Sequence, residues 1–127
     1  MKPNKKQIES VSALPPIERY KHFIKRFADF EECWSIVDED GELVILEVDD
    51  YKFISLWSSK EYIEMDENLG TIIPNNYTLE YFQQTLFDFI EKNNLLINVF
   101  SIKGKTGFIV SLGEFVRDLN EELSQYD

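Results

Sequence analysis

The sequence has one cysteine, Cys33, and one histidine, His22, among its 127 residues. A lone cysteine allows no disulfide within the chain, and these two residues cannot complete the usual Cys and His ligand set of zinc. We therefore predict no disulfide and no metal site. We also reject a nucleophilic Cys33–His22 pair, because helical spacing puts His22 on the polar face of a helix while Cys33 enters the following strand.

Long apolar runs are also absent. No stretch approaches the roughly 20 residues that span a bilayer, and the polar start, residues 1–6, is not followed by the apolar segment of a secretory signal. Together with the lone cysteine, these absences favour the cytoplasm as the compartment.

Motifs that bind phosphate or calcium are incomplete. Gly104-Lys105-Thr106 resembles the end of a phosphate-binding loop, but Val99 stands at the first glycine position and the pattern predicts a strand, not a helix, after it. The acidic residues 38–42 resemble a calcium loop, but their glycine comes fourth rather than sixth. Glycine motifs of dinucleotide-binding proteins and serine hydrolases do not occur. We predict no cofactor and assign no catalytic residue.

Positive charge is scarce, with 13 Lys and Arg against 24 Asp and Glu and a net charge of −11. Such a surface repels phosphate, so we predict binding to neither nucleic acid nor an anionic membrane. The imbalance is uneven: residues 1–30 carry seven basic and three acidic side chains, and residues 31–127 carry six basic and 21 acidic ones. The acidic part is either a solvated face that maintains solubility or a docking surface for a basic protein partner.

Residues 16–31 form a strongly amphipathic segment with a proline at its first position. At 100° per residue its apolar side chains fall in one arc, and its charged side chains lie opposite. The arc consists of Ile17, Tyr20, Phe23, Ile24, Phe27, Ala28 and Phe30. This spacing predicts a helix that packs its aromatic side on a core.

Caps and turn residues predict the remaining elements. Further helices are predicted over residues 5–13, from Ser58 to about residue 67, from Thr78 to about residue 92, and from Ser111 to about residue 123. Strands are predicted over residues 33–37, 43–48, 53–57, 71–73, 95–102 and 106–110. The run at residues 43–46 does not alternate, so we expect that strand to be covered on both faces. The result is one α+β domain over residues 1–127, a mostly antiparallel sheet built from hairpins and packed by about five helices. Residues 1–14 form an N-terminal helix and connector, and residues 124–127 fray.

Several residues carry a resemblance to a known family. They are Glu18-Arg19-Tyr20, Phe23-Ile24, Asp29, Trp34, Asp38, Gly41, Asp50, the strand ending in Leu56-Trp57 and the strand from Leu95 to Phe100. With these, the chain resembles the bacterial family catalogued as domain of unknown function 2750 over nearly its whole length. Ser55 and Ser58 stand where members often have proline. The resemblance implies a small α+β fold but no catalytic residues, since the family has no established activity.

Our candidate binding residues are the polar and aromatic positions that match the family, together with the acidic turn. They are Arg19, Asp29, Trp34, Asp38, Asp40, Asp50 and Trp57. The favoured hypothesis is a non-enzymatic interaction or regulatory domain, immunity-like in character, whose residues 38–50 and 61–67 contact a basic protein.

Two alternatives remain open. One is a small-ligand sensor or an uncharacterised enzyme, with a pocket between the helix of residues 16–31 and the sheet, lined by Arg19, Asp29, Trp34 and Trp57. The other is a homodimer in which the basic helix face of one copy meets the acidic face of the next. Arg19 and Asp29 could also serve only to tie the helix to the sheet.

Overall fold

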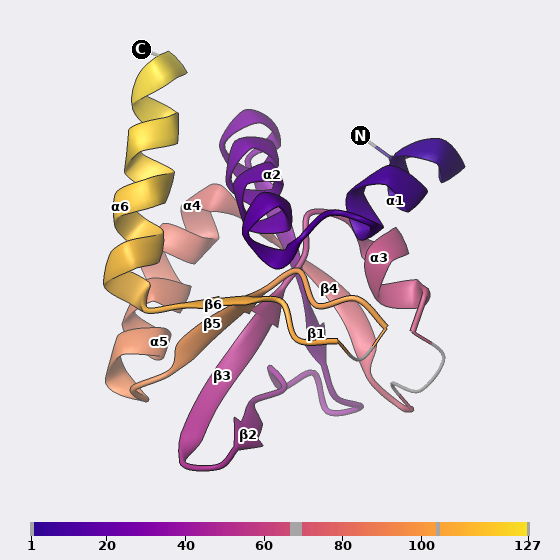
Figure 1. Ribbon diagram of the computed structural model, residues 1–127. Coiled ribbons are helices and arrows are strands. Elements are labelled where there is room, and N and C mark those ends of the chain that lie inside the picture. The colour runs from indigo at the N-terminus through magenta and orange to yellow at the C-terminus, as the bar shows by residue number, and fades with distance from the viewer. Residues whose placement is uncertain (1, 67–69, 104, 127) are drawn as a thin grey trace.

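The predicted amphipathic helix is α2 (Pro16–Phe30) of the computed structural model, which describes residues 2–66, 70–103 and 105–126. Most of its apolar arc is buried as predicted, with Phe23 and Phe27 fully enclosed, but Ile17 and Phe30, near the two ends of the helix, are exposed. Glu31 ends the helix in the left-handed conformation, with φ of 57°. Figure 1 shows α2 lying over the strands beside α6, with the chain termini at the same end of the molecule.

Hydrogen-bonding side chains start three of the other helices as predicted. The side chain of Asn4 accepts from the backbone amide of Gln7, and that of Thr78 accepts from the amide of Tyr81. Ser111 forms a capping box with Glu114. The helical elements are α1 (Lys5–Ser12), α3 (Lys60–Glu64), α4 (Leu79–Tyr81), the π-helical η1 (Phe82–Leu86), α5 (Phe87–Lys92), α6 (Leu112–Leu123) and the 3₁₀ turn η2 (Ser124–Tyr126). Because α4, η1 and α5 are continuous, the described residues contain about the predicted number of helices.

The strands form two sheets. They are β1 (Glu32–Val37), β2 (Leu46–Val48), β3 (Tyr51–Leu56), β4 (Ile73–Thr78), β5 (Leu96–Val99) and β6 (Phe108–Val110). β1 pairs with β4 alone, and the second sheet has the order β2-β3-β5-β6. Every pair is antiparallel except β3–β5, which is parallel. The fold is therefore α+β and mostly antiparallel, as predicted.

The two sheets are joined by a bridge between the two tryptophans. The amide of Trp34 donates to the carbonyl of Trp57 at 2.8 Å, and the amide of Trp57 donates back at 2.9 Å. The Ser35 hydroxyl adds a bond of 2.6 Å to the carbonyl of Ser55. β1 and β3 are thus held side by side where one sheet passes into the other.

Aromatic side chains fill the core between the helices and the second sheet. The ring of Phe82 lies 5.4 Å from Phe27 and 5.7 Å from Phe115, in tilted or edge-on contacts typical of buried aromatic pairs. These three side chains have no exposed surface. The core therefore connects α2, the π-helical turn and α6.

Some strand boundaries differ from prediction. The prediction of one strand over residues 43–48 with both faces covered is wrong. Leu43 bridges to Val37 of β1, and only Leu46–Val48 pairs with β3, with all three residues exposed. The brief strand expected before Pro74 instead starts at Ile73 and runs through the proline. A sheet edge tolerates this residue, because its missing N–H group has no partner to lose.

One helix prediction also needs correction. Ser59 rather than Ser58 stands at the N-cap position of the third helix, and its side chain makes no capping bond, because its hydroxyl donates to a carboxylate oxygen of Glu61 at 3.0 Å. Residue 67, at its predicted end, lies outside the described residues, as do Gly104 of the last hairpin turn and Asp127 of the tail. None of the described helices is long and apolar enough to cross a membrane.

Candidate functional site

Arg19 is a buried residue that connects α2 to the segment following β5. Its side chain is 6 % exposed, and its Nε donates to the carbonyl of Phe100 at 2.9 Å. A second guanidinium nitrogen donates to the carbonyl of Leu14. Burial lowers the pKa of Arg19 from its ordinary value. The contacts of this predicted site residue hold backbone segments together.

Trp57 anchors the same segment. Its indole Nε1 donates to the carbonyl of Ser101 at 2.7 Å. Trp34, its bridge partner, is half-buried and borders a shallow hollow of about 390 Å³ with Lys60, Glu64 and residues 74–76. The two tryptophans therefore share a backbone bridge but line different hollows.

The predicted pocket between α2 and the sheet is not formed by its four candidate residues. Asp29 is exposed on α2, ten residues beyond Arg19, whose side chain bonds to carbonyl groups rather than to this carboxylate. Trp57 lines a cavity that contains neither residue. The structure does not bring Arg19, Asp29, Trp34 and Trp57 around one site.

A groove with a volume of about 690 Å³ lies between α2 and α6. Across it, the hydroxyl of Tyr20 donates to Asp118 at 2.6 Å, and Asp118 also pairs with Arg117 at 3.2 Å. Burial and this carboxylate raise the pKa of Tyr20. The groove is therefore crossed by a helix-to-helix bond that fixes its two walls.

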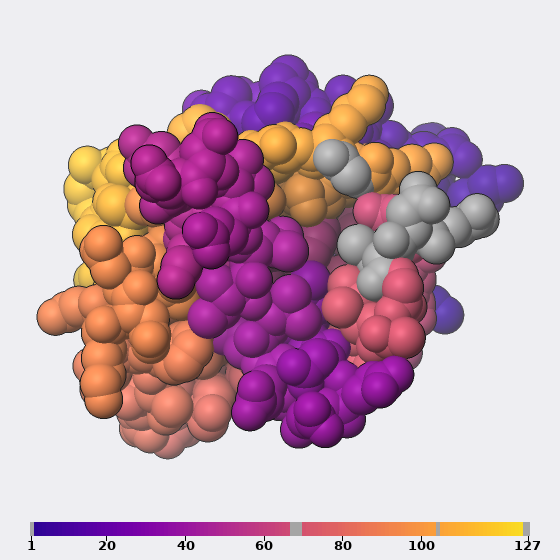
Figure 2. Space-filling view, turned by 90° about the horizontal axis from the view of Figure 1, so that it is seen from below, coloured from indigo at the N-terminus to yellow at the C-terminus, as the bar shows by residue number. Residues whose placement is uncertain are grey.

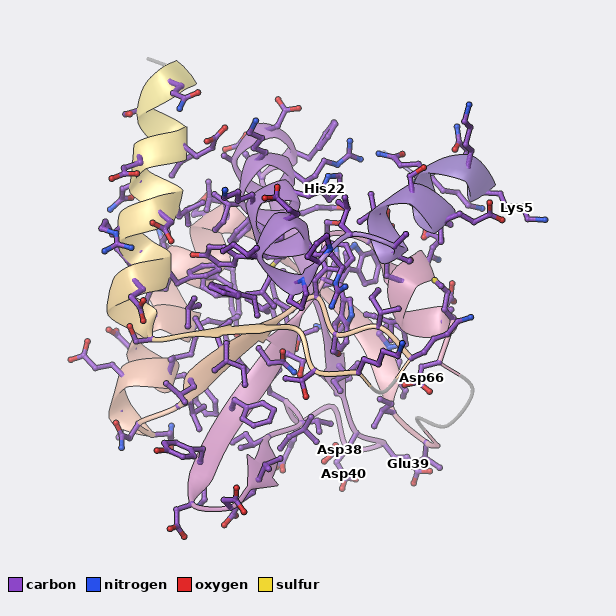
Figure 3. All side chains as sticks on the ribbon, viewed as in Figure 1. Lys5, His22, Asp38, Glu39, Asp40 and Asp66 are labelled. Carbon is purple, nitrogen blue, oxygen red and sulfur yellow. The ribbon has the colours of Figure 1, made fainter. Side chains whose placement is uncertain are left out.

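The acidic residues 38–50 include the loop that follows β1 and the turn between β2 and β3. Figure 3 shows Asp38, Glu39 and Asp40 together at the lower edge of the molecule, pointing away from the core. Asp38 has a structural task, because its Oδ1 accepts from the amides of Asp40 and Glu42. Asp40 is exposed, and so is Asp50, which lies in the turn between β2 and β3.

β2 itself is an exposed edge strand that presents apolar side chains between these carboxylates. Leu46 is 40 % exposed and Val48 is 57 % exposed. Tyr51, which pairs with Val48 from β3, is 64 % exposed. The β2 strand stands at the end of the sheet order and pairs only with β3. An edge strand of this kind leaves backbone donors and acceptors open to another chain.

A smaller cavity of about 220 Å³ lies beneath β3, and Trp57 is the one candidate binding residue from the sequence in its lining. Figure 2 shows this face, where a hollow opens between the β2–β3 hairpin and the residues that follow β5. Ser55 lies in the cavity wall, is 1 % exposed, and has a hydroxyl with no hydrogen-bond partner in the described structure. In the sequence, Ser55 stands at the centre of an apolar strand, at a position where family members often have proline.

Nucleophilic and metal chemistry find little support in the geometry. Cys33 is fully buried, and burial followed by the nearby charge of Glu32 raises the pKa of its thiol. His22 is on α2, half-buried against the ring of Phe100. Within the described ranges, no group of three or more His, Cys, Asp or Glu side chains is placed to hold a metal ion.

The comparisons with known proteins agree with the resemblance in the sequence. No curated protein matches the chain. A family model described as a protein of unknown function, DUF2750, matches residues 20–119, from the middle of α2 to the third turn of α6. This match covers most of the chain, including every described strand. The chain therefore belongs to the DUF2750 family.

Proposed function

We propose that this protein is a non-enzymatic protein-binding domain, and that the free edge of β2 binds an extended, basic segment of its partner. The observation that carries this proposal is the edge strand itself, since all three of its residues are exposed and it has one unpaired side. Extended peptides bind such edges by adding a strand, with main-chain hydrogen bonds for affinity and alternate side chains for specificity.

Charge selects the partner. Residues 38–50 contain seven Asp and Glu side chains and no Lys or Arg. The salt bridges Lys21–Glu18 and Arg117–Asp118 lie on α2 and α6, and no described Lys or Arg forms one with these seven carboxylates. A basic segment would neutralise them and associate faster at low salt.

The same charge argues against a second copy of this chain at this edge. Pairing two β2 strands would bring 14 carboxylates together, seven from each copy, and like charges placed opposite one another destabilise strand pairs. The apolar side chains Leu46, Val48 and Tyr51 would instead contact the apolar positions of a segment that alternates basic and apolar residues.

A synthetic peptide of alternating Lys and Val tests the proposal. Fluorescence anisotropy should show binding that weakens by roughly ten-fold between about 20 and about 300 mM salt, because screening shortens the reach of the carboxylates. The variant Glu47→Lys/Asp50→Lys should lower the affinity at low salt by about ten-fold or more. Tyr51→Ser should weaken binding at both salt concentrations, since it removes apolar contact.

Asp88→Lys/Glu91→Lys is the matched control. It changes the net charge equally, at two exposed positions of α5, which is not part of the acidic segment of residues 38–50. This variant should bind the peptide like the wild type. Equal losses in both double variants would mean that total charge alone drives binding, and the proposal would then be wrong.

A further inference from the structure

We propose that the cavity beneath β3 binds a small organic carboxylate with an apolar body, whose far end carries a hydroxyl or carbonyl oxygen that pairs with Ser55. The cavity shares Leu46 and Val48 of its wall with the face of β2 described above, but its polar groups are different residues, and the proposal does not depend on the function proposed above. The starting observation is the hydroxyl of Ser55, which is buried in the cavity wall without a partner. Leaving such a group unpaired is costly, so its presence in a cavity points to a bound polar atom.

Hydrogen bonds hold the groups around Ser55 in place. Asn98 lies directly opposite Ser55 on β5 and also lines the cavity. Its side-chain oxygen accepts from the amide of Gly107 at 3.0 Å, which fixes the orientation of the Asn98 amide. The hydroxyl of Ser35 bonds to the backbone carbonyl of Ser55, which fixes the strand but leaves the Ser55 hydroxyl available.

Apolar side chains make up most of the remaining wall. They are Ile36, Leu46, Val48, Phe53, Trp57, Tyr62 and Ile63. A dry apolar cavity of about 150 Å³ holds one benzene molecule, so the 220 Å³ found here has room for a six-membered ring with a short side arm. A mainly apolar pocket with a few placed polar groups is typical of small-molecule sites.

The charge at the cavity selects an anion. Lys103 and Lys105 both contribute to its lining, and they are two of only six basic residues beyond position 30. Asp66 also lines the cavity and opposes an anion, but two lysines against one carboxylate leave a net positive charge. Both lysines are exposed, so a ligand carboxylate next to them would stay near water while the apolar body enters.

Four related probes separate the parts of this proposal: 4-hydroxyphenylacetate, phenylacetate, 4-hydroxyphenylacetamide and tyramine. In two-dimensional NMR titrations, 4-hydroxyphenylacetate should shift the amide signals of Ser55 and Asn98. Phenylacetate, which lacks the hydroxyl, should bind roughly three- to ten-fold more weakly. The neutral amide and the cationic amine should bind more weakly than the acid, because they lose the attraction of the lysines.

Variants assign each preference to its residue. In Ser55→Ala the two acids should bind equally, and this variant should fold because the lost hydroxyl has no protein partner. In Lys103→Gln/Lys105→Gln the acid should lose its advantage over the amide. Lys5→Gln/Lys6→Gln, on α1, changes two lysines that do not line the cavity and should leave all four affinities unchanged.

Two results would overturn the proposal. If none of the probes moves the signals of the cavity residues, the cavity holds water only. If Ser55→Ala keeps the preference for the hydroxylated acid, the serine does not face the ligand. Neither result would affect the peptide test on β2, so the two proposals can fail separately.

Discussion

Arg19 holds the carbonyl of Phe100 through a hydrogen bond of 2.9 Å between α2 and the end of β5. Phe100 is fully buried and has a φ of 65°, a conformation that few non-glycine residues adopt. Its amide is fixed as well, by the carbonyl of Leu56 at 2.8 Å. The strained turn after β5 is thus held on both sides of one residue, at the amide of Phe100 and at its carbonyl.

Replacing this arginine should destabilise the fold. We expect Arg19→Met to lower the free energy of unfolding by about 2–4 kcal/mol, because the carbonyls of Phe100 and Leu14 both lose their donor. Arg19→Lys should be less damaging, since one ammonium can keep one of the two bonds. Urea unfolding followed by circular dichroism measures the change. An Arg19→Met protein as stable as the wild type would mean that both carbonyls find water.

Gly107 should tolerate no side chain. A Cβ atom there would lie 2.1 Å from the carbonyl oxygen of Val99 and 2.8 Å from Oδ1 of Asn98. We expect Gly107→Ala to cost about 3 kcal/mol or more, since backbone must move to make room. Gly113→Ala is the control, because its Cβ would meet open space on α6 and alanine favours a helix by up to about 1 kcal/mol. Thermal unfolding of both variants should therefore shift in opposite directions.

Two serines on neighbouring strands should respond differently to the same substitution. Ser35→Ala removes the buried bond of 2.6 Å to the carbonyl of Ser55 and should cost about 1–2 kcal/mol. Ser55→Ala removes a hydroxyl without a partner and should leave stability unchanged or raise it slightly. Chemical denaturation of both proteins provides the comparison. A larger loss for Ser55→Ala would show that its hydroxyl is satisfied by a tightly held water.

His22 should make the fold sensitive to mild acid. Burial, followed by repulsion from Arg26, lowers the pKa of His22 below its ordinary value of 6.5. The unfolded chain therefore takes up a proton at a higher pH than the folded one, so this residue destabilises the fold as pH falls below about 6.5. Between about pH 7.5 and 5.5, wild type should lose more stability than His22→Gln. Equal slopes of unfolding free energy against pH would contradict this.

Local chemistry explains why much of the fold could be predicted. Asn4, Thr78 and Ser111 cap helices through bonds to residues three positions away, so the evidence for each helix start lies within one turn of sequence. The aromatic arc of α2 follows from spacing alone. The edge strand β2 was predicted as part of a covered strand, because an unbroken apolar run does not reveal that only Leu43 and Val44 turn inward.

The candidate site depended on long-range contacts that sequence spacing does not contain. Arg19 and Phe100 are 81 residues apart, and Trp57 meets the carbonyl of Ser101 across 44. The resemblance to the family pointed to Arg19, Trp34 and Trp57, but it did not show that Arg19 and Trp57 bond to the turn after β5. The cavity at Ser55 arises only when β3 lies beside β5, a parallel pairing that the hairpin pattern does not predict.

That parallel pairing also bears on how the chain folds. Between the end of β3 and the start of β5 the chain makes an excursion of 39 residues (57–95), during which it adds β4 to β1 and forms the π-helical segment. Closing so long a loop costs entropy before any contact compensates for it. The hairpins β2–β3 and β5–β6 can form early because their partners are close in sequence. Pairing of β3 with β5 should be the slow step in folding. Variants that weaken this pairing should slow refolding more than they speed unfolding.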